Sequence, residues 1–235
     1  MRLDKFLSHN GFGTRKEVKS LIKKGLVSVN GEVIKVDKYQ LNELEDQVLC
    51  DGIKIEYSKY VYYLLNKPEN YVSATTDNKY PTVIELIDDY YGNDLFPVGR
   101  LDIDTTGLLI LTNDGVFAHN LLSPKKHVDK EYIALIDDIV DQDDIDAFKN
   151  GIILDDFTTH SSSLKILETY DDTTLVSVTI DEGKYHQVKR MFESRHKHVL
   201  KLKRIRMKNL LLDDTLDEGK YRKLTEEEIN DLKGI

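Results

Sequence analysis

The pattern of apolar and polar residues predicts a small N-terminal unit of two helices and a hairpin. Apolar residues recur at helical spacing over residues 3–7 and again over residues 14–24. Thr14 and Glu17 have the spacing of a capping box, which predicts the start of the second helix. Residues 27–34 alternate about an Asn-Gly pair, a strong hairpin signal.

Beyond residue 59 the pattern predicts more strands than helices. Strand-like runs cover residues 60–65, 108–111, 132–136, 163–167, 175–180 and 199–207. Helical patterns cover residues 82–91, 116–122, 142–150, 185–194 and 225–232. Because several strands follow one another directly, we expect an α+β fold with a mixed or antiparallel sheet. We place the domains at 1–58 and 59–235.

Composition narrows the class of protein. The chain has 235 residues, 40% of them hydrophobic, which is enough for a substantial core. The single cysteine, Cys50, excludes a disulfide framework and a cysteine-based zinc site, and fits a reducing compartment. No apolar stretch has the length of a membrane helix, and the N-terminus has no apolar signal core. We therefore expect a cytoplasmic protein with no membrane partner.

The distribution of charge matters more than its sum. The net charge is −9, which by itself argues against nucleic-acid binding. However, residues 1–38 hold nine Lys/Arg against four Asp/Glu, and residues 182–208 hold ten against two. Acidic residues gather instead over residues 137–156, with eight Asp and one Lys. Because phosphate binding depends on local basic surface, the two basic segments predict an RNA or DNA partner.

Candidate chemistry centres on Asp102, which follows Arg100 beside an apolar run. Residues 102–106 also fit the Asp-x-Asp-x-Thr pattern of magnesium-dependent phosphatases, with Asp102 as nucleophile and Asp104 as acid-base. That pattern should follow a continuous buried strand, whereas residues 96–100 contain Pro and Gly. A turn capped by Asp102 is the structural alternative.

Four motifs together resemble the RNA pseudouridine synthases, in the branch of the ribosomal small-subunit pseudouridine synthase A. Gly-Arg-Leu-Asp at residues 99–102, with Ile-Asp-Thr-Thr-Gly-Leu-Leu at 103–109, resembles the catalytic motif of that family, and Gly107 is its second glycine. Asn-Lys-Pro at 66–68, Lys-Glu-Tyr at 130–132 and the run 182–192 are similar to its other motifs, in the same order. The N-terminal unit resembles the alpha-L RNA-binding module that this branch carries.

The resemblance implies isomerisation of a uridine by one carboxylate, without metal or cofactor. Asp102 would attack the sugar or assist a glycal-like route, and these alternatives stay open. Tyr132 would stack on the detached uracil. A cation should keep Asp102 ionised, with Lys189 as first candidate and Arg190 as second.

The same resemblance implies that the target base leaves the RNA stack and that basic residues hold the backbone. The expected RNA contacts are Arg15, Lys16, Lys19, Lys23, Arg100, His186, Gln187, Arg190, Lys203 and Arg204. Relatives commonly have a glycine near the end of the last long strand, whereas residues 204–208 contain none. This departure concerns substrate fit more than chemistry.

We expect the substrate to be ribosomal RNA. Residues 186–191 resemble the small-subunit form of the motif, so we expect RNA of the small subunit. The protein would act as a monomer, on a small-subunit assembly intermediate. Two alternatives belong to other classes: an RNA-binding assembly factor that no longer uses its catalytic domain, and the magnesium phosphatase.

Overall fold

The computed structural model describes residues 1–43, 45–55, 59–88 and 94–234. These residues divide into two compact units. The first comprises Met1–Val61 with Ile87–Leu95, and the second comprises Tyr62–Leu86 with Phe96–Ile235. The boundary expected after residue 58 adjoins residues 56–58, which lie outside the described part, so its exact position stays a prediction.

The first unit combines two helices with a four-stranded antiparallel sheet. Its elements are α1 (Leu3–His9), α2 (Arg15–Lys23), β1 (Val27–Val29), β2 (Glu32–Val33), β3 (Val48–Cys50) and β4 (Ile53–Ile55). The strands lie in the order β2-β1-β3-β4. Both predicted helices and the predicted hairpin are confirmed. Strands β3 and β4 were not predicted, because each is only three residues long.

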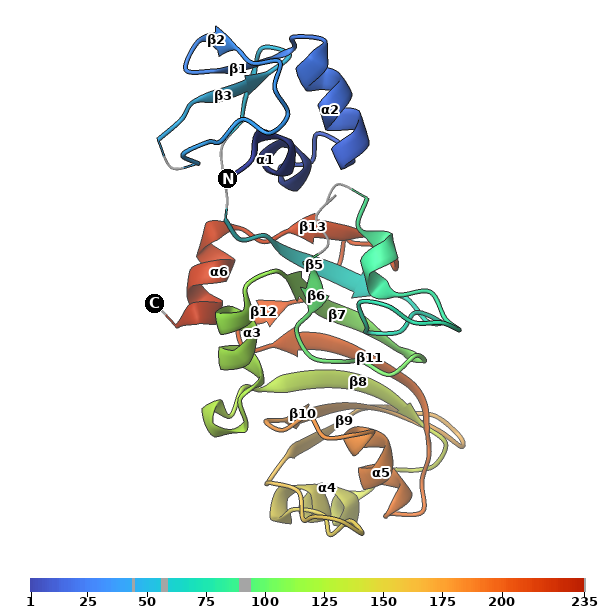
Figure 1. Cartoon of the computed structure of the whole chain (residues 1–235). Coiled ribbons are helices and arrows are strands. Elements are labelled where there is room, and N and C mark those ends of the chain that lie inside the picture. Colours follow the sequence, from blue (N-terminus) through green and yellow to red (C-terminus); the bar gives the residue numbers. More distant parts are fainter. Residues whose placement is uncertain (44, 56–58, 89–93, 235) are drawn as a thin grey trace. The chain divides into compact units, whose positions relative to one another are not determined.

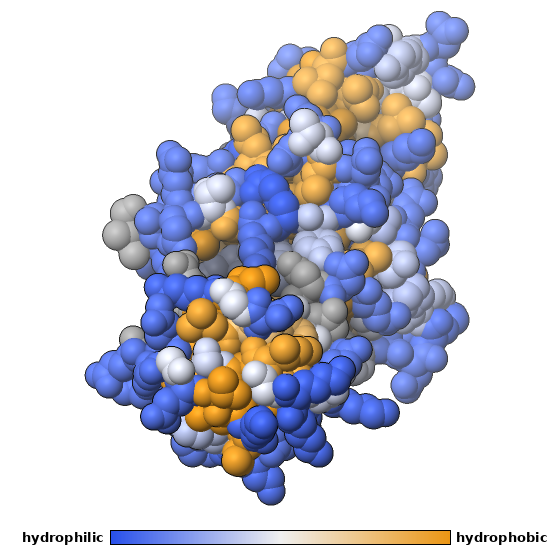
Figure 2. All heavy atoms as spheres, turned by 90° about the horizontal axis from the view of Figure 1, so that it is seen from above, coloured by the Kyte–Doolittle hydropathy of each residue, from blue (hydrophilic) through white to orange (hydrophobic). Residues whose placement is uncertain are grey.

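The amphipathic pattern of α1 and α2 forms the core of this unit. Leu3, Phe6 and Ile22 are almost completely buried, together with residues of β1 and β3. The Thr14–Glu17 capping box is formed, so the start of α2 is fixed by its own side chains. Outside the core the surface is largely hydrophilic, with scattered apolar patches on the face drawn in Figure 2.

The second unit is built on one long mixed sheet, which confirms the α+β prediction. Its strands are β5 (Tyr62–Lys67), β6 (Phe96–Pro97), β7 (Thr105–Thr112), β8 (Lys130–Ile136), β9 (Ser163–Thr169), β10 (Thr174–Ile180), β11 (Val199–Met207), β12 (Leu210–Leu211) and β13 (Tyr221–Lys223). The main path is β13-β5-β7-β11-β8-β10-β9, with β6 paired to β7 and β12 paired to β11. Figure 1 shows this sheet running through the unit.

Helices lie near both ends of the sheet. They are α3 (Gly115–Leu122), α4 (Gln142–Asn150), α5 (Gln187–Glu193) and α6 (Glu226–Lys233), with short 3-10 turns η1 (Val83–Leu86) and η2 (Pro124–Lys126). Helices α3 and α6 lie together, and so do α4 and α5 (Figure 1). Phe148 of α4 and Phe192 of α5 join the second pair, with ring centroids 4.9 Å apart.

The parallel pairing of β7 with β11 brings distant parts of the chain together. Arg204 is the partner of Gly107, where the backbone has φ +98°. A Cβ atom at Gly107 would lie 2.2 Å from the Arg204 carbonyl oxygen. Only glycine fits there, because it allows both this φ and this close approach. The motif glycine therefore sets the distance between β7 and β11, which flank the site described below.

One predicted helix, over residues 82–91, is wrong. Only Val83–Leu86 form a 3-10 turn, and residues 89–93 lie outside the described part. Glu85 accepts hydrogen bonds from the backbone and hydroxyl of Thr82, as a capping residue would, but the turn does not continue. A helix continued to residue 91 would place Asp88 in its last turn, where the helix dipole disfavours negative charge. Among the described residues no helix has the length and hydropathy to cross a membrane.

Candidate active site

The loop that carries Asp102 is held on both sides by backbone contacts. The Ser73 hydroxyl donates to the Leu101 carbonyl at 2.9 Å and accepts from the Leu101 N–H at 3.0 Å. On the far side, the Thr105 N–H donates to the Asp102 carbonyl at 3.1 Å, which closes a turn. Asp102 itself is half-buried, so its carboxylate faces a pocket from a fixed backbone.

A buried lysine lies under the same loop. Lys67 ends β5 and is fully buried, and its Nζ donates to the carbonyl oxygens of Pro68, Ile103 and Thr105 at 3.0, 3.3 and 2.8 Å. Burial lowers the pKa of Lys67 to about 8, and the carboxylates of Asp104 and Asp102 oppose that shift. Lys67 therefore ties β5 to the loop that carries Asp102, with its own charge buried. Asn-Lys-Pro at 66–68 was expected only as a motif, with no role for this lysine.

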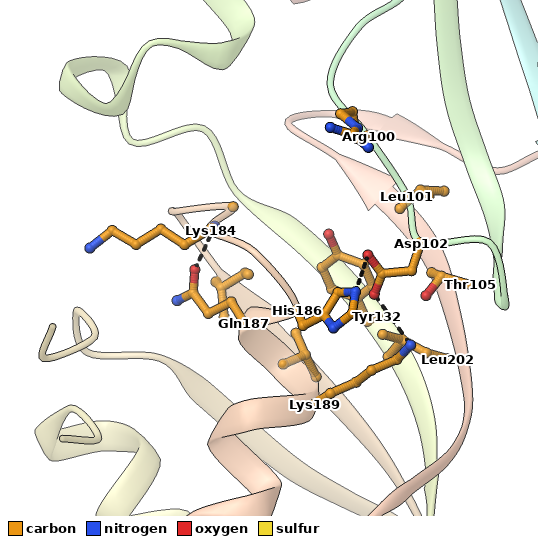
Figure 3. Close-up of a pocket in the computed structure, with 13 residues that line it drawn as sticks. Arg100, Leu101, Asp102, Thr105, Tyr132, Lys184, His186, Gln187, Lys189 and Leu202 are labelled. Atoms are coloured by element: carbon orange, nitrogen blue, oxygen red, sulfur yellow. Dashed lines mark hydrogen bonds and ion pairs between the residues drawn. The ribbon is translucent and has the colours of Figure 1, made fainter. Parts of the chain in front are cut away.

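Lys189 and His186 both approach the Asp102 carboxylate. Lys189 Nζ lies 3.3 Å from Asp102 Oδ2, and His186 Nε2 lies 3.4 Å from Asp102 Oδ1. Figure 3 shows both side chains pointing toward Asp102. The Lys189 ammonium also donates to Asp104 Oδ1 at 2.6 Å. One ammonium thus lies against two carboxylates. The contact with Asp104 was not predicted.

Interactions within this cluster favour the charged forms of Lys189 and Asp104. Burial acts to lower the pKa of Lys189, but hydrogen bonding to Asp104 and the charges of both carboxylates outweigh it and raise that pKa. Burial likewise acts to raise the pKa of Asp104, and Lys189 outweighs it, so that pKa is lowered. The site therefore holds an ionised lysine beside an ionised Asp104 at neutral pH.

Arg190, the second candidate for the cation, points elsewhere. Its guanidinium forms an ion pair with Asp156 and lies over the Phe157 ring, 5.5 Å from the ring centroid. Asp156 follows α4 along the chain, so Arg190 braces α5 against that region. Between the two neighbouring basic residues, the geometry places Lys189 at Asp102.

Apolar side chains form the walls of the pocket around Asp102. The lining includes Leu101, Tyr132, Ile180, Val188 and Leu202. Tyr132 is 7% exposed and alternates along β8 with residues that face the other side of the sheet. A flat aromatic ring beside a carboxylate and an ammonium, between apolar walls, suits a planar heterocyclic base with polar edges.

His186 owes its position to an unusual backbone conformation. Its φ is +49°, in the left-handed region, and it precedes the first residue of α5. The predicted helix over residues 185–194 therefore begins two residues later than expected. The His186 ring stacks on Tyr185, with centroids 3.8 Å apart, and Tyr185 is 76% exposed. Tyr185 had not been singled out, and it offers an exposed aromatic face at the mouth of the pocket.

Several expected RNA contacts occupy different surroundings. Arg100 is exposed and lines the pocket. Gln187 is 3% exposed, accepts from the Lys184 N–H and donates to Glu182, so it braces the loop before α5. Arg204 is 3% exposed, and its Nε donates to the Leu108 carbonyl at 2.8 Å. These buried side chains do not offer the backbone contact expected of them, because other parts of the fold hold them.

Lys203 lies on the other face of the sheet from the pocket. It pairs with Ile133 in β8, while its neighbour Leu202 lines the pocket. Because successive strand residues point to opposite faces, the Lys203 side chain does not point into the pocket that contains Asp102. Its contact with the RNA backbone stays a prediction.

The basic residues expected to bind RNA in the first unit lie on α2. Arg15, Lys16 and Lys23 are exposed. Lys19 is partly covered, and its Nζ lies 3.4 Å from Asp37 and 4.0 Å from Asp4. Lys19 is therefore already paired with acids of its own unit, whereas the other three form no ion pair with any residue that the structure describes.

The fold, the motif glycine and the carboxylate–lysine–tyrosine pocket define an RNA-modifying enzyme, and family models agree. A model described as RNA pseudouridylate synthase matches residues 61–194, and a model of the S4 domain matches residues 1–58. The chain belongs to the RNA pseudouridylate synthase family, which are RNA isomerases, and it carries an S4 domain. The phosphatase hypothesis is wrong. Its two aspartates do not share an open cation position, since Lys189 lies between them.

Individual relatives match along the full length. The ribosomal small subunit pseudouridine synthase A of Haemophilus influenzae is 38% identical over 234 residues, which are 99% of both chains. The ribosomal large subunit pseudouridine synthase B of Bacillus subtilis is 37% identical over 244 residues, covering 100% of this chain and 96% of the relative. A solved pseudouridylate synthase is 37% identical, covers 99% of both chains and superposes with a TM-score of 0.69.

Proposed function

We propose that this chain isomerises a specific uridine of ribosomal RNA to pseudouridine, with Asp102 as the reacting carboxylate and without a cofactor. The observation that carries the proposal is the convergence of Asp102, Lys189 and Tyr132 in one pocket that has both charged and apolar walls. The family match supports the reaction class, and the geometry supports the assignment of these residues.

The reaction needs one carboxylate that remains ionised near an apolar wall. It breaks the bond from ribose to the uracil nitrogen, turns the base and joins the ribose to carbon 5. Asp102 either attacks the sugar or assists departure of the base, and then accepts a proton. The ammonium of Lys189, at 3.3 Å, supplies an opposite charge to the Asp102 carboxylate.

Tyr132 holds the detached base. The walls that include Leu202 and Val188 exclude water from one side, and the Tyr132 ring gives a stacking surface on which uracil can turn. Its hydroxyl is the group best able to reach the carbon-5 proton. No step requires electron transfer or phosphoryl transfer, so these residues suffice.

RNA is held by cations on two separate surfaces. In the second unit, Arg100 and the stacked His186 and Tyr185 lie at the mouth of the pocket, where they would hold the flanking backbone of a flipped nucleotide. In the first unit, Arg15, Lys16 and Lys23 present charge to phosphates. Arg204, Gln187 and Arg190 are left out of this set because of their surroundings. Lys203, which does not point into the pocket, stays a predicted backbone contact.

We propose small-subunit ribosomal RNA as the substrate, within an assembly intermediate, and a monomeric cytoplasmic enzyme. Residues 186–191 support the small-subunit assignment. Overall identity does not decide it, because relatives with 38% and 37% identity carry small-subunit and large-subunit names.

The experiment is to map pseudouridine in ribosomal RNA from cells with and without the gene. We expect one site in small-subunit RNA to lose its pseudouridine and to regain it when the gene is restored. A site lost from large-subunit RNA would contradict the subunit assignment. An unchanged map would overturn the proposal and favour an assembly factor without activity.

A further inference from the structure

Away from Asp102, two histidines and an aspartate from three segments of the second unit converge. His127 Nδ1 lies 2.6 Å from Asp181 Oδ2, and His160 Nδ1 lies 3.0 Å from Asp181 Oδ1. The two imidazole rings have centroids 5.5 Å apart. One nitrogen of each histidine and one carboxylate oxygen lie within 4.8 Å of one another.

The backbone fixes each of the three residues. His127 follows η2 with φ +47°, a left-handed conformation that is uncommon outside glycine, and this turns its ring toward Asp181. His160 donates its backbone N–H to Glu182 Oε2 at 3.0 Å. The Asp181 carbonyl accepts from the buried Lys130 Nζ at 3.3 Å. The cluster is therefore held by its surroundings and not only by its own hydrogen bonds.

The donor atoms suit a divalent transition-metal ion. Imidazole nitrogen and carboxylate oxygen are ligands of Zn²⁺ and of its neighbours in the first transition row. The side chains of His127, His160 and Asp181 are 58%, 48% and 22% exposed, so an ion can reach them. Tetrahedral coordination at bonds of about 2.0 Å needs ligand atoms about 3.3 Å apart. The His127–Asp181 separation of 2.6 Å would have to widen by about 0.7 Å, and the His160–Asp181 separation of 3.0 Å by about 0.3 Å.

The local charge also favours a cation. Asp181 and Glu182 are adjacent, and His160 Nε2 lies 3.9 Å from Glu182 Oε1. The nearby Lys184 ammonium is already directed at Glu182, at 3.4 Å. An ion would replace the protons that now join the imidazoles to Asp181, with each ring proton carried on Nε2.

We propose that His127, His160 and Asp181 form a binding site for one Zn²⁺-like ion, with its remaining coordination positions open to water. The ion takes no part in the isomerisation. Asp181 directly follows Ile180, which lines the pocket. The ion would therefore link the start of the loop that carries His186 to the segments of His127 and His160.

The test measures Zn²⁺ binding to the full chain by competition with a chromophoric chelator, and Co²⁺ binding by visible absorption. We expect one ion per chain, with affinity about tenfold or more lower in His160→Gln and in His127→Asn. The matched control is His198→Gln. His198 also pairs with an aspartate, at 2.9 Å from Asp137, but has no second histidine in the cluster. The Zn²⁺ affinity of His198→Gln should equal that of the unaltered chain.

Metal-free thermal unfolding shows whether the variants are folded, and we expect melting temperatures close to that of the unaltered chain. Either histidine variant that is folded suffices for the comparison. Absence of one-to-one binding, full affinity in a folded His160→Gln or His127→Asn, or an equal loss in His198→Gln would overturn the proposal.

Discussion

Lys189 Nζ lies 3.3 Å from Asp102 Oδ2. Lys189 belongs to the first turn of α5, and Asp102 belongs to the loop that follows β6. Asp104 Oδ1 holds the same ammonium at 2.6 Å. The more exposed Asp104 therefore holds the Lys189 ammonium in place, and the ammonium remains within reach of Asp102 in the pocket. Lys189 therefore supplies a countercharge to Asp102 in the pocket that Tyr132 and Leu202 also line.

Removal of the ammonium should alter the pH dependence of turnover. In Lys189→Met the Asp102 carboxylate loses the cation that lies 3.3 Å away, and loss of a nearby opposite charge disfavours a charged nucleophile. We expect turnover to fall by about tenfold or more at pH ~7 and to recover partly as the pH rises. The measurement is a single-turnover pH–rate profile on ribosomal RNA.

Arg190→Met is the control, because Arg190 pairs with Asp156 and not with Asp102. Its profile should keep the shape of the unaltered enzyme. A Lys189→Met curve that differs only in scale would show that Lys189 contacts RNA and does not support the carboxylate.

Addition of one methyl group at Gly107 should separate β7 from β11. The new Cβ would meet the Arg204 backbone at 2.2 Å, and the φ of +98° disfavours alanine as well. We expect Gly107→Ala to lose at least about 3 kcal/mol of unfolding free energy, measured by urea denaturation, or not to fold. Gly115→Ala is the control, since it meets open space within α3. It should be neutral or stabilising by about 0.5–1 kcal/mol.

The exposed cations of α2 should contribute to RNA affinity through phosphates. We expect the triple variant Arg15→Gln, Lys16→Gln, Lys23→Gln to bind RNA more weakly, with a salt dependence reduced by about one unit per lost contact. Affinity would be measured by filter binding at several salt concentrations. Lys54→Gln, an exposed lysine of β4 in the same unit, should leave the slope unchanged. Equal slopes for the triple variant and the unaltered chain would show that α2 serves another purpose.

Burial of Lys67 should make stability depend on pH. Its pKa is lowered to about 8 in the folded state, from 10.5. Between these values the unfolded chain holds a proton that the folded chain lacks, so stability rises with pH. We expect the unfolding free energy of the unaltered chain to gain up to about 2 kcal/mol over that of Lys67→Met between pH ~8 and ~10. Urea denaturation at both values measures it, and a constant difference would contradict the burial of a charged Lys67.

Apart from the helix expected over residues 82–91, the helices and the first hairpin could be predicted because their signals are local. Apolar spacing and the Thr14–Glu17 pair fix α2, and the Asn-Gly pair fixes the turn between β1 and β2. Strand β13 could not be predicted in this way. It spans only Tyr221–Lys223, and its partner β5 lies more than 150 residues earlier in the chain.

The positions of residues on β11 could not be predicted either. Its register with β8 shifts between Arg204 and Arg206, and such a bulge changes which side chains face the pocket. Lys203 and Arg204 were therefore placed on the RNA side from charge alone. At the end of this strand, Lys208 adopts φ +53°, near where the family resemblance led us to expect a glycine. Lys208 Nζ donates to the Asp231 and Leu232 carbonyls of α6, a role that glycine lacks.

Within the site, Asp102 and Tyr132 were given roles through their motifs. Asp104, Lys67 and Tyr185 also lie in motif segments, but the contacts that they make were not predicted. Their contacts with Lys189, Ile103 and His186, respectively, join segments that are far apart in sequence, except for the last pair. Such contacts depend on the folded sheet and on backbone conformations like that of His186. Residue type and spacing alone do not reveal them.

The central claim is that the Asp102 carboxylate carries out the isomerisation, and Asp102→Asn tests it most directly. The amide keeps the shape and hydrogen bonding of the side chain but removes its charge and nucleophile. Pseudouridine formation on ribosomal RNA under single-turnover conditions should be undetectable, while RNA affinity changes little because phosphate contacts dominate it. Pseudouridine formation by Asp102→Asn at more than a trace of the normal rate would contradict the account.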